Sequence, residues 1–152
     1  CFRQRILGSM AGKPEKIAHS LMVKLVEIAD RQKRDCFLIA FSVSVHPIDI
    51  RKERARLLEF FSKTSCGDTD ATRMLEATFR LLESHRKYMN ADILWISDFK
   101  IPLSTPELIR KMQEYRKADT LFYGMQIGIG EHEWASFFNH IYRVEYTSNR
   151  RY

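Results

Sequence analysis

The chain has 152 residues, which is the size of one domain with a single sizeable core. Hydrophobic residues make up 45% and charged residues 29%, a composition that is ordinary for a globular protein and excludes a long low-complexity tract. The formal net charge of +6 raises nucleic acid as a partner, but the basic residues are mostly interleaved with acids and favour a solvated surface. No apolar run approaches the ~20 residues that a membrane helix needs, and no signal peptide is recognisable.

The first residue is a cysteine, and the sequence enters almost directly into structured patterns. We therefore expect residues 1–152 to form a single domain cut from a longer, cytoplasmic protein. The cysteines, Cys1, Cys36 and Cys66, are odd in number and lack CxxC spacing. This pattern favours free thiols in a reducing compartment over disulfides or a structural zinc site.

The first half of the chain predicts one long helix and two strands after a weak beginning. Residues 1–7 make a poor strand because polar residues interrupt the apolar ones. A helix is expected from Pro14 to about Lys33, with proline in its first turn and apolar residues at helical spacing. The apolar run 36–42 predicts a buried strand, and the alternation in 43–50 predicts an antiparallel edge strand, where Pro47 is tolerated.

The second half alternates helices and strands. A helix should begin near Lys52, and Thr69 or Asp70 should cap the next one. The run 93–99 predicts a central strand of a parallel sheet, since it is apolar and bounded by turn-forming residues. After that strand we expect a helix that starts at Ser104–Glu107, a strand at 120–127, a short helix at 134–138 and a last strand at 140–146.

This order of elements predicts an α/β fold. We expect a Rossmann-like, doubly wound and mostly parallel six-stranded sheet, with one antiparallel edge strand and helices on both faces. In such sheets, ligands bind beyond the carboxyl ends of the strands. Asp98 comes at such an end and is the first candidate for a functional residue.

Three loops should emerge at or beside the same edge: 8–10, 67–70 and 97–98. They carry hydroxyls and carboxylates, which suit a hard divalent cation such as Mg²⁺ or Mn²⁺. Each fragment is weak alone, and 67–70 equally fits a turn followed by a helix cap. No phosphate-binding loop or nucleophile elbow is present. His132 and His140 lie on different elements without a second ligand at fixed spacing, so a metal role is not expected for them.

Together these loops make the chain resemble a von Willebrand factor A-type (VWA) domain, of the bacterial ViaA-like branch that works with MoxR-type AAA+ ATPases. The resemblance covers nearly the whole chain and implies a metal-ion-dependent adhesion site (MIDAS). Carried over, Ser9 matches the second serine of the Asp-x-Ser-x-Ser motif, Thr69 the threonine and Asp98 the aspartate. Asp70 would either support these ligands from behind or cap the following helix.

The chain departs from the family in the first motif, where Arg5 stands at the leading aspartate position and Leu7 at the first serine position. Two unit charges ~4 Å apart repel by about 4 kcal/mol at an effective dielectric near 20, so a cation beside the metal matters. Two hypotheses remain open. Either the domain is metal-independent, with Arg5 replacing the cation or pointing away, or residues 1–7 are not native to this domain.

The resemblance implies protein–protein recognition in which a partner's carboxylate completes the metal coordination, and it implies an AAA+ ATPase partner. The alternative is an enzyme, a Mg²⁺-dependent hydrolase or phosphatase that uses Asp98 as ligand or nucleophile. It would need a general acid or base near Asp98, and the sequence identifies none. Nucleic-acid binding rests on the net charge alone, so we expect neither that activity nor catalysis.

Overall fold

The computed structural model describes residues 12–39, 47–62, 71–130 and 132–146. The helices in these ranges are α1 (Lys13–Arg31), α2 (Arg54–Ser62), α3 (Ala71–Ser84) and α4 (Pro106–Lys117), with 3₁₀ turns η1 (Arg86–Tyr88) and η2 (Glu133–Phe137). The strands are β1 (Phe37–Leu38), β2 (Ile48–Asp49), β3 (Ile93–Ser97), β4 (Phe122–Ile127) and β5 (His140–Val144). None of the helices in these ranges combines the length and apolarity that crossing a bilayer requires.

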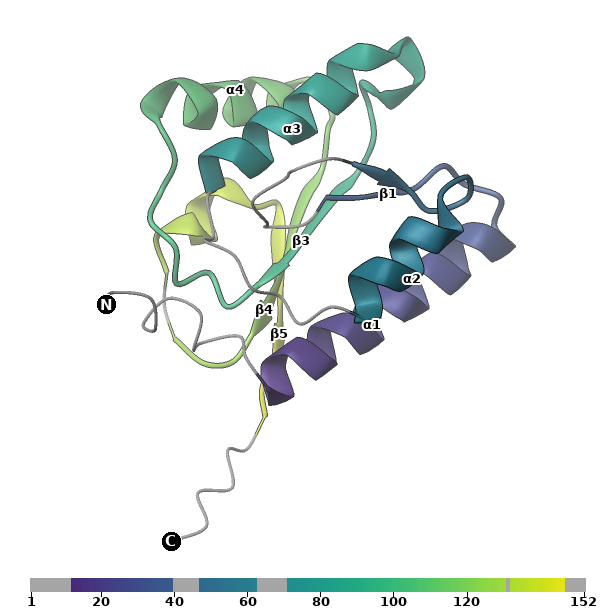
Figure 1. Cartoon of the computed structure of the whole chain (residues 1–152). Coiled ribbons are helices and arrows are strands. Elements are labelled where there is room, and N and C mark those ends of the chain that lie inside the picture. The colour runs from purple at the N-terminus through teal and green to yellow at the C-terminus, as the bar shows by residue number, and fades with distance from the viewer. Residues whose placement is uncertain (1–11, 40–46, 63–70, 131, 147–152) are drawn as a thin grey trace, which may run out of the picture.

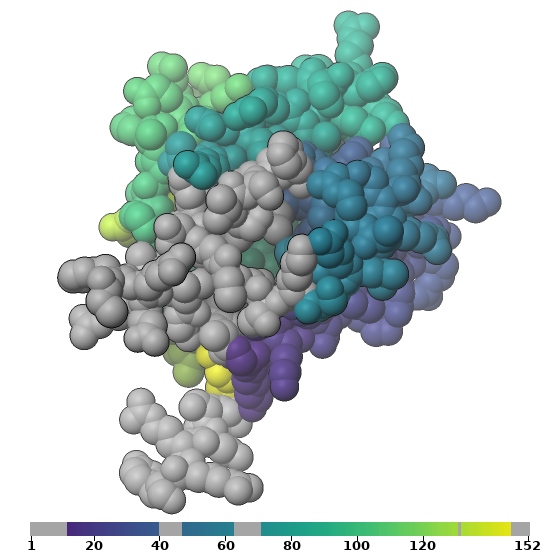
Figure 2. Space-filling model, viewed as in Figure 1, coloured from purple at the N-terminus to yellow at the C-terminus, as the bar shows by residue number. Residues whose placement is uncertain are grey.

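A three-stranded parallel sheet in the order β3-β4-β5 forms the centre of the structure. Its register places Ser97 opposite Gln126 and Gln126 opposite Arg143, so the three carboxyl ends lie along one edge. Helices α3 and α4 lie on one side of this sheet, and α1 and α2 lie together on the other (Figure 1). On the surface, residues 71–117 (teal to green) gather along one side and residues 13–62 (purple to blue) along another (Figure 2).

The predicted six-stranded, doubly wound sheet is wrong. In the described ranges the structure has five short strands in two separate sheets, because β1 pairs only with β2. The antiparallel pairing of these two strands is confirmed, but they form their own two-stranded sheet instead of extending the parallel one. The poor strand pattern at 1–7 lies outside the described residues.

The apolar run that begins at Cys36 explains the error. Leu38 packs against a small core made with α1 and α2, whereas Ile39 packs against the larger core beneath α3 and α4. The run is therefore apolar because it lies between two cores. An apolar run reports burial and does not by itself report hydrogen bonding to a neighbouring strand.

The helices begin and end close to where the sequence predicts. Pro14 and Pro106 lie in the first turns of α1 and α4, where a missing N–H costs nothing. Helix α3 buries one continuous face, including Leu75, Phe79 and Leu82, as its apolar spacing requires. The strand at 93–99 is two residues shorter than predicted and ends at Ser97, which leaves Asp98 in the following loop.

Aromatic side chains fill the larger core below the carboxyl edge of the sheet. Trp95 packs edge-on against Trp134, with ring centroids 4.6 Å apart, and lies 5.8 Å from the Phe138 ring. Gly124 makes this packing fit, since a Cβ atom there would stand 3.3 Å from the Phe138 ring and from Ile141. This core therefore reaches from α3 and α4 to the residues that follow β3.

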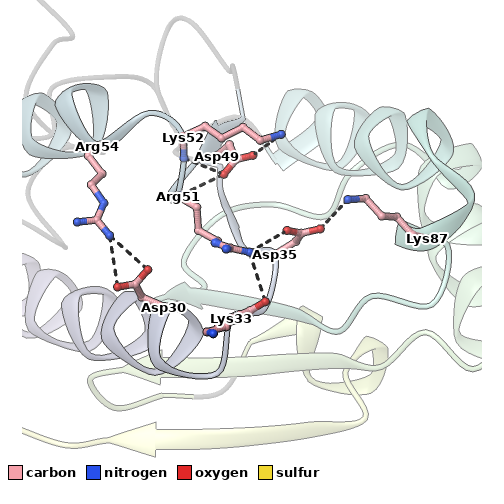
Figure 3. A network of polar contacts seen from close by, with 8 residues as sticks. All are labelled: Asp30, Lys33, Asp35, Asp49, Arg51, Lys52, Arg54 and Lys87. Carbon is pink, nitrogen blue, oxygen red and sulfur yellow. Dashed lines mark hydrogen bonds and ion pairs between the residues drawn. The ribbon is translucent and has the colours of Figure 1, made fainter.

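A network of charged groups joins the end of α1 to the β1–β2 hairpin, to the start of α2 and to η1 (Figure 3). Asp35 accepts a hydrogen bond from Lys87 at 2.7 Å and lies 3.6 Å from Arg51. The Lys87 hydrogen bond lowers the pKa of the Asp35 carboxyl and raises that of the Lys87 amine. Because these groups are exposed, the network contributes little to stability.

Asn139, the residue before β5, makes two hydrogen bonds to Phe122 at the start of β4. Its backbone N–H donates to the Phe122 carbonyl at 2.7 Å, and its side-chain oxygen accepts from the Phe122 N–H at 2.9 Å. Asn139→Ala leaves the N–H of buried Phe122 without that acceptor, so we expect a loss of about 1–3 kcal/mol in unfolding free energy. Urea denaturation measures it, with Asn90→Ala, an exposed asparagine, as control; equal midpoints for the two variants contradict the assignment.

Candidate functional site

Asp98 lies immediately after β3, at the edge where the carboxyl ends of the parallel strands meet. Its Oδ1 accepts the Lys100 N–H at 3.2 Å, and the Ser97 hydroxyl accepts the Phe99 N–H at 3.1 Å. The two side chains thus hold the turn through its own backbone. Phe99 takes a positive φ of 57°, in the left-handed region that bulky residues rarely adopt.

The Asp98 carboxylate is buried but only half satisfied. The residue is 8% exposed, and its Oδ2 has no hydrogen-bond partner among the described residues. A buried carboxylate oxygen without a donor is costly, so such atoms mark places where a cation, a donor or water completes the contacts. Asp98 can therefore offer one oxygen to a ligand at the sheet edge.

The loop after β4 lies against the loop after β3. Trp134 Nε1 donates to the Ile101 carbonyl at 2.9 Å, and the His132 ring stacks on Phe99 with centroids 4.6 Å apart. Gln126, which is 2% exposed, donates from Nε2 to the Gly130 carbonyl at 2.8 Å. The contacts of Trp134 and His132 join residues 98–101 to residues 132–134, and the Gln126 bond holds Gly130 against β4. We call the surface that these two loops form the two-loop edge.

The two-loop edge also presents apolar surface. Ile129 is 75% exposed between Gly128 and Gly130, whose φ values of 103° and 134° suit glycine. Leu103 is exposed on the neighbouring loop. A single exposed apolar residue is ordinary, and Ile129 offers one apolar side chain for contact from the loop after β4.

Three residues of this edge were missed by sequence reasoning. Gln126 Oε1 and both ring nitrogens of His132 are buried and have no hydrogen-bond partner among the described residues, and Phe99 takes the positive φ. Gln126 could have been noticed as a polar residue within the apolar run 120–127, because a buried polar side chain is informative. The sequence offers no comparable signal for the stacking of His132 on Phe99.

Of the site residues predicted from the sequence, the structure places Asp98. Ser9, Thr69 and Asp70, together with Arg5 and Leu7, lie outside the described residues. Within the described ranges, no three His, Cys, Asp or Glu side chains are grouped so that they could hold a metal ion. The oxygen-ligand site thus stays a prediction, with Asp98 as its one described member.

His132 gives the edge a pH dependence. Burial lowers the pKa of its imidazole first, and the charge of Arg143 lowers it further. The unfolded chain takes up this proton at a higher pH than the folded chain. The stability that neutral His132 contributes is therefore present above the unfolded pKa and lost as the pH falls through about 6.5 towards the folded value.

We expect the free energy of unfolding from urea titrations to fall between about pH 7.5 and pH 5.5, and His132→Phe to remove that part of the fall. A phenyl ring keeps the shape of the stack but binds no proton. The same pH dependence in wild type and His132→Phe would contradict the assignment to His132.

No protein-family model matches the chain. The chain is 30% identical over 112 residues to Regulatory protein ViaA of Edwardsiella ictaluri (strain 93-146). The aligned part covers 70% of this chain and 23% of that relative, so the chain spans less than a quarter of the relative's length. The similarity supports a ViaA-like protein.

Proposed function

We propose that the domain is a regulatory, protein-binding module of VWA type whose binding surface is the two-loop edge around Asp98. The observation that carries the proposal is the buried Asp98 Oδ2, which has no partner among the described residues. The relative's name, a regulatory protein, agrees with a role in controlling another protein. Exposed Ile129 adds an apolar side chain on the loop after β4.

The proposal includes a divalent cation, Mg²⁺ or Mn²⁺, held by Asp98 with Ser9 and Thr69, and with Asp70 behind them. A free, buried carboxylate oxygen fits a hard cation, which prefers oxygen ligands. When bound, the cation would supply a positive charge for a partner's carboxylate. Arg5 and Leu7 stand at two ligand positions of the family, so the chain offers fewer protein oxygens to the cation. We therefore expect weak cation binding that depends strongly on Asp98.

The proposed partner is a protein, with a MoxR-type AAA+ ATPase as the specific candidate from the VWA resemblance. A cytoplasmic location stays a prediction of the sequence. The hydrolase alternative would need a general acid or base within reach of a substrate at Asp98, and the name of the relative, a regulatory protein, gives it no support.

Isothermal titration with Mn²⁺ and Mg²⁺ tests the cation. We expect saturable one-site binding that Asp98→Ala abolishes, because that variant removes the buried carboxylate. Asp92→Ala is the matched control, since Asp92 is an exposed aspartate at the opposite end of β3. Binding that persists in Asp98→Ala, or is lost equally in Asp92→Ala, would place the cation elsewhere.

Capture from native extract tests the partner. The wild-type domain with Mg²⁺ should retain a AAA+ ATPase, identified by mass spectrometry, and Asp98→Ala or added EDTA should reduce its recovery at least tenfold, about 1.4 kcal/mol of binding. Ile129→Ser should also reduce recovery, whereas Leu58→Ser, which alters an equally exposed leucine on α2, should not. Equal recovery by wild type and Asp98→Ala would rule out a cation-bridged contact.

A further inference from the structure

Phe99 is an unusual residue for its backbone position. Its φ of 57° lies in the left-handed region, which glycine and asparagine occupy easily and a bulky aromatic residue does not. The residue is 1% exposed, so solvent contact does not account for the conformation. Strained backbone of this kind persists only where surrounding contacts hold it, and it concentrates at functional sites.

Two sets of contacts hold Phe99. The Ser97 hydroxyl accepts its N–H at 3.1 Å, and the Trp95 and Phe138 rings pack around its own ring at 5.5 and 5.1 Å. On top of these, His132 stacks nearly parallel to it, with the ring planes 19° apart. The stack comes from the loop after β4, so it ties that loop to the backbone beside Asp98.

The contact with Phe99 is the main interaction of the His132 ring within the described residues. Neither of its ring nitrogens forms a hydrogen bond with the described residues, although both are buried. A buried imidazole normally satisfies at least one nitrogen. The flat contact with Phe99 is thus the interaction through which this ring acts on the site.

We propose that His132 is a positioning residue for Asp98: it clamps Phe99 in the left-handed conformation and so fixes where the neighbouring carboxylate stands. Phe99 lies between Asp98 and Lys100, and the Lys100 N–H donates to Asp98 Oδ1. A change in φ at Phe99 therefore moves the Lys100 N–H relative to the Asp98 backbone, and these two groups hold the carboxylate. The inference rests on the proposed cation site, because it concerns the use of Asp98 there.

A purely structural His132 would behave differently. It would fill space in the larger core, and its removal would lower stability without changing the affinity of a folded site. A positioning residue changes affinity as well. Partners that orient metal ligands from behind typically contribute 10–100-fold to metal affinity.

The experiment compares Mn²⁺ affinity by isothermal titration in wild type, His132→Ala, His132→Phe and His85→Ala, well below each variant's midpoint of thermal unfolding. We expect His132→Ala to weaken binding by about 10-fold or more. His132→Phe keeps a flat ring against Phe99 and should restore affinity to within about twofold of wild type, which is well below the 10-fold loss expected for His132→Ala. His85 also contacts an aromatic ring, that of Tyr88, but near the opposite end of β3, so His85→Ala should bind as wild type does.

A second readout needs no metal. In metal-free protein, the backbone amide resonances of Asp98, Phe99 and Lys100 should shift in His132→Ala and return towards wild-type positions in His132→Phe. If His132→Ala does not fold, Phe99→Leu removes the same stack from the other side and should weaken Mn²⁺ binding to a similar extent.

The outcomes separate the two proposals. Wild-type affinity in His132→Ala, or equal loss in His132→Phe and His132→Ala, overturns the positioning role while the cation site stands. Absence of any Asp98-dependent Mn²⁺ binding in wild type overturns the cation site, and the positioning role with it.

Discussion

The aromatic packing below the carboxyl edge of the parallel sheet is the constraint on which the rest of the structure depends. Trp95, Trp134, Phe138 and Phe99 form one continuous cluster, and Gly124 leaves the space that Phe138 occupies. Full burial of a side chain of this size contributes about 1.5–3 kcal/mol, and aromatic pairs at these distances add to that. The same cluster fixes the two loops that surround Asp98.

This arrangement couples the stability of the core to the geometry of the edge. Trp134 is fully buried and bonds the Ile101 carbonyl, while Phe99 is buried in a conformation that the chain would not adopt alone. The core therefore holds the loop after β3 in a backbone conformation that is unfavourable for Phe99. A loop held in this way is preorganised, and preorganisation lowers the cost of binding a ligand or partner there.

The sequence predicts the elements of the fold much better than their arrangement. Helical spacing and proline positions place α1, α3 and α4 closely, and the apolar run at 93–99 predicts a parallel strand correctly apart from its last two residues. Its central place was predicted wrongly, because β3 lies at the edge of the three-stranded sheet and β4 is the central strand. The sheet was predicted wrongly, because the run at Cys36 is buried between two cores without joining the parallel strands. Pairing depends on contacts between distant segments, which local patterns do not encode.

The candidate site divides in a similar way. A carboxylate after a buried strand is visible in the sequence, and the structure places Asp98 directly after the carboxyl end of β3. The roles of Phe99, Gln126 and His132 depend on a positive φ, an unpartnered amide oxygen and a ring stack. Gln126 is visible in the sequence as a polar residue within an apolar run, but the positive φ of Phe99 and the stack of His132 on it do not follow from residue type or spacing. The stack joins two loops that are about thirty positions apart in the chain.

The central claim is that Asp98 offers a buried oxygen to a divalent cation at this edge. A crystal structure of the protein grown with Mn²⁺, with anomalous diffraction collected near the manganese edge, tests it most directly. The account predicts one strong anomalous peak about 2.1 Å from Asp98 Oδ2, at the distance of a first-row divalent ion from a carboxylate oxygen. An Asp98 Oδ2 that accepts a hydrogen bond from a protein donor, with no anomalous peak beside it, would contradict the account.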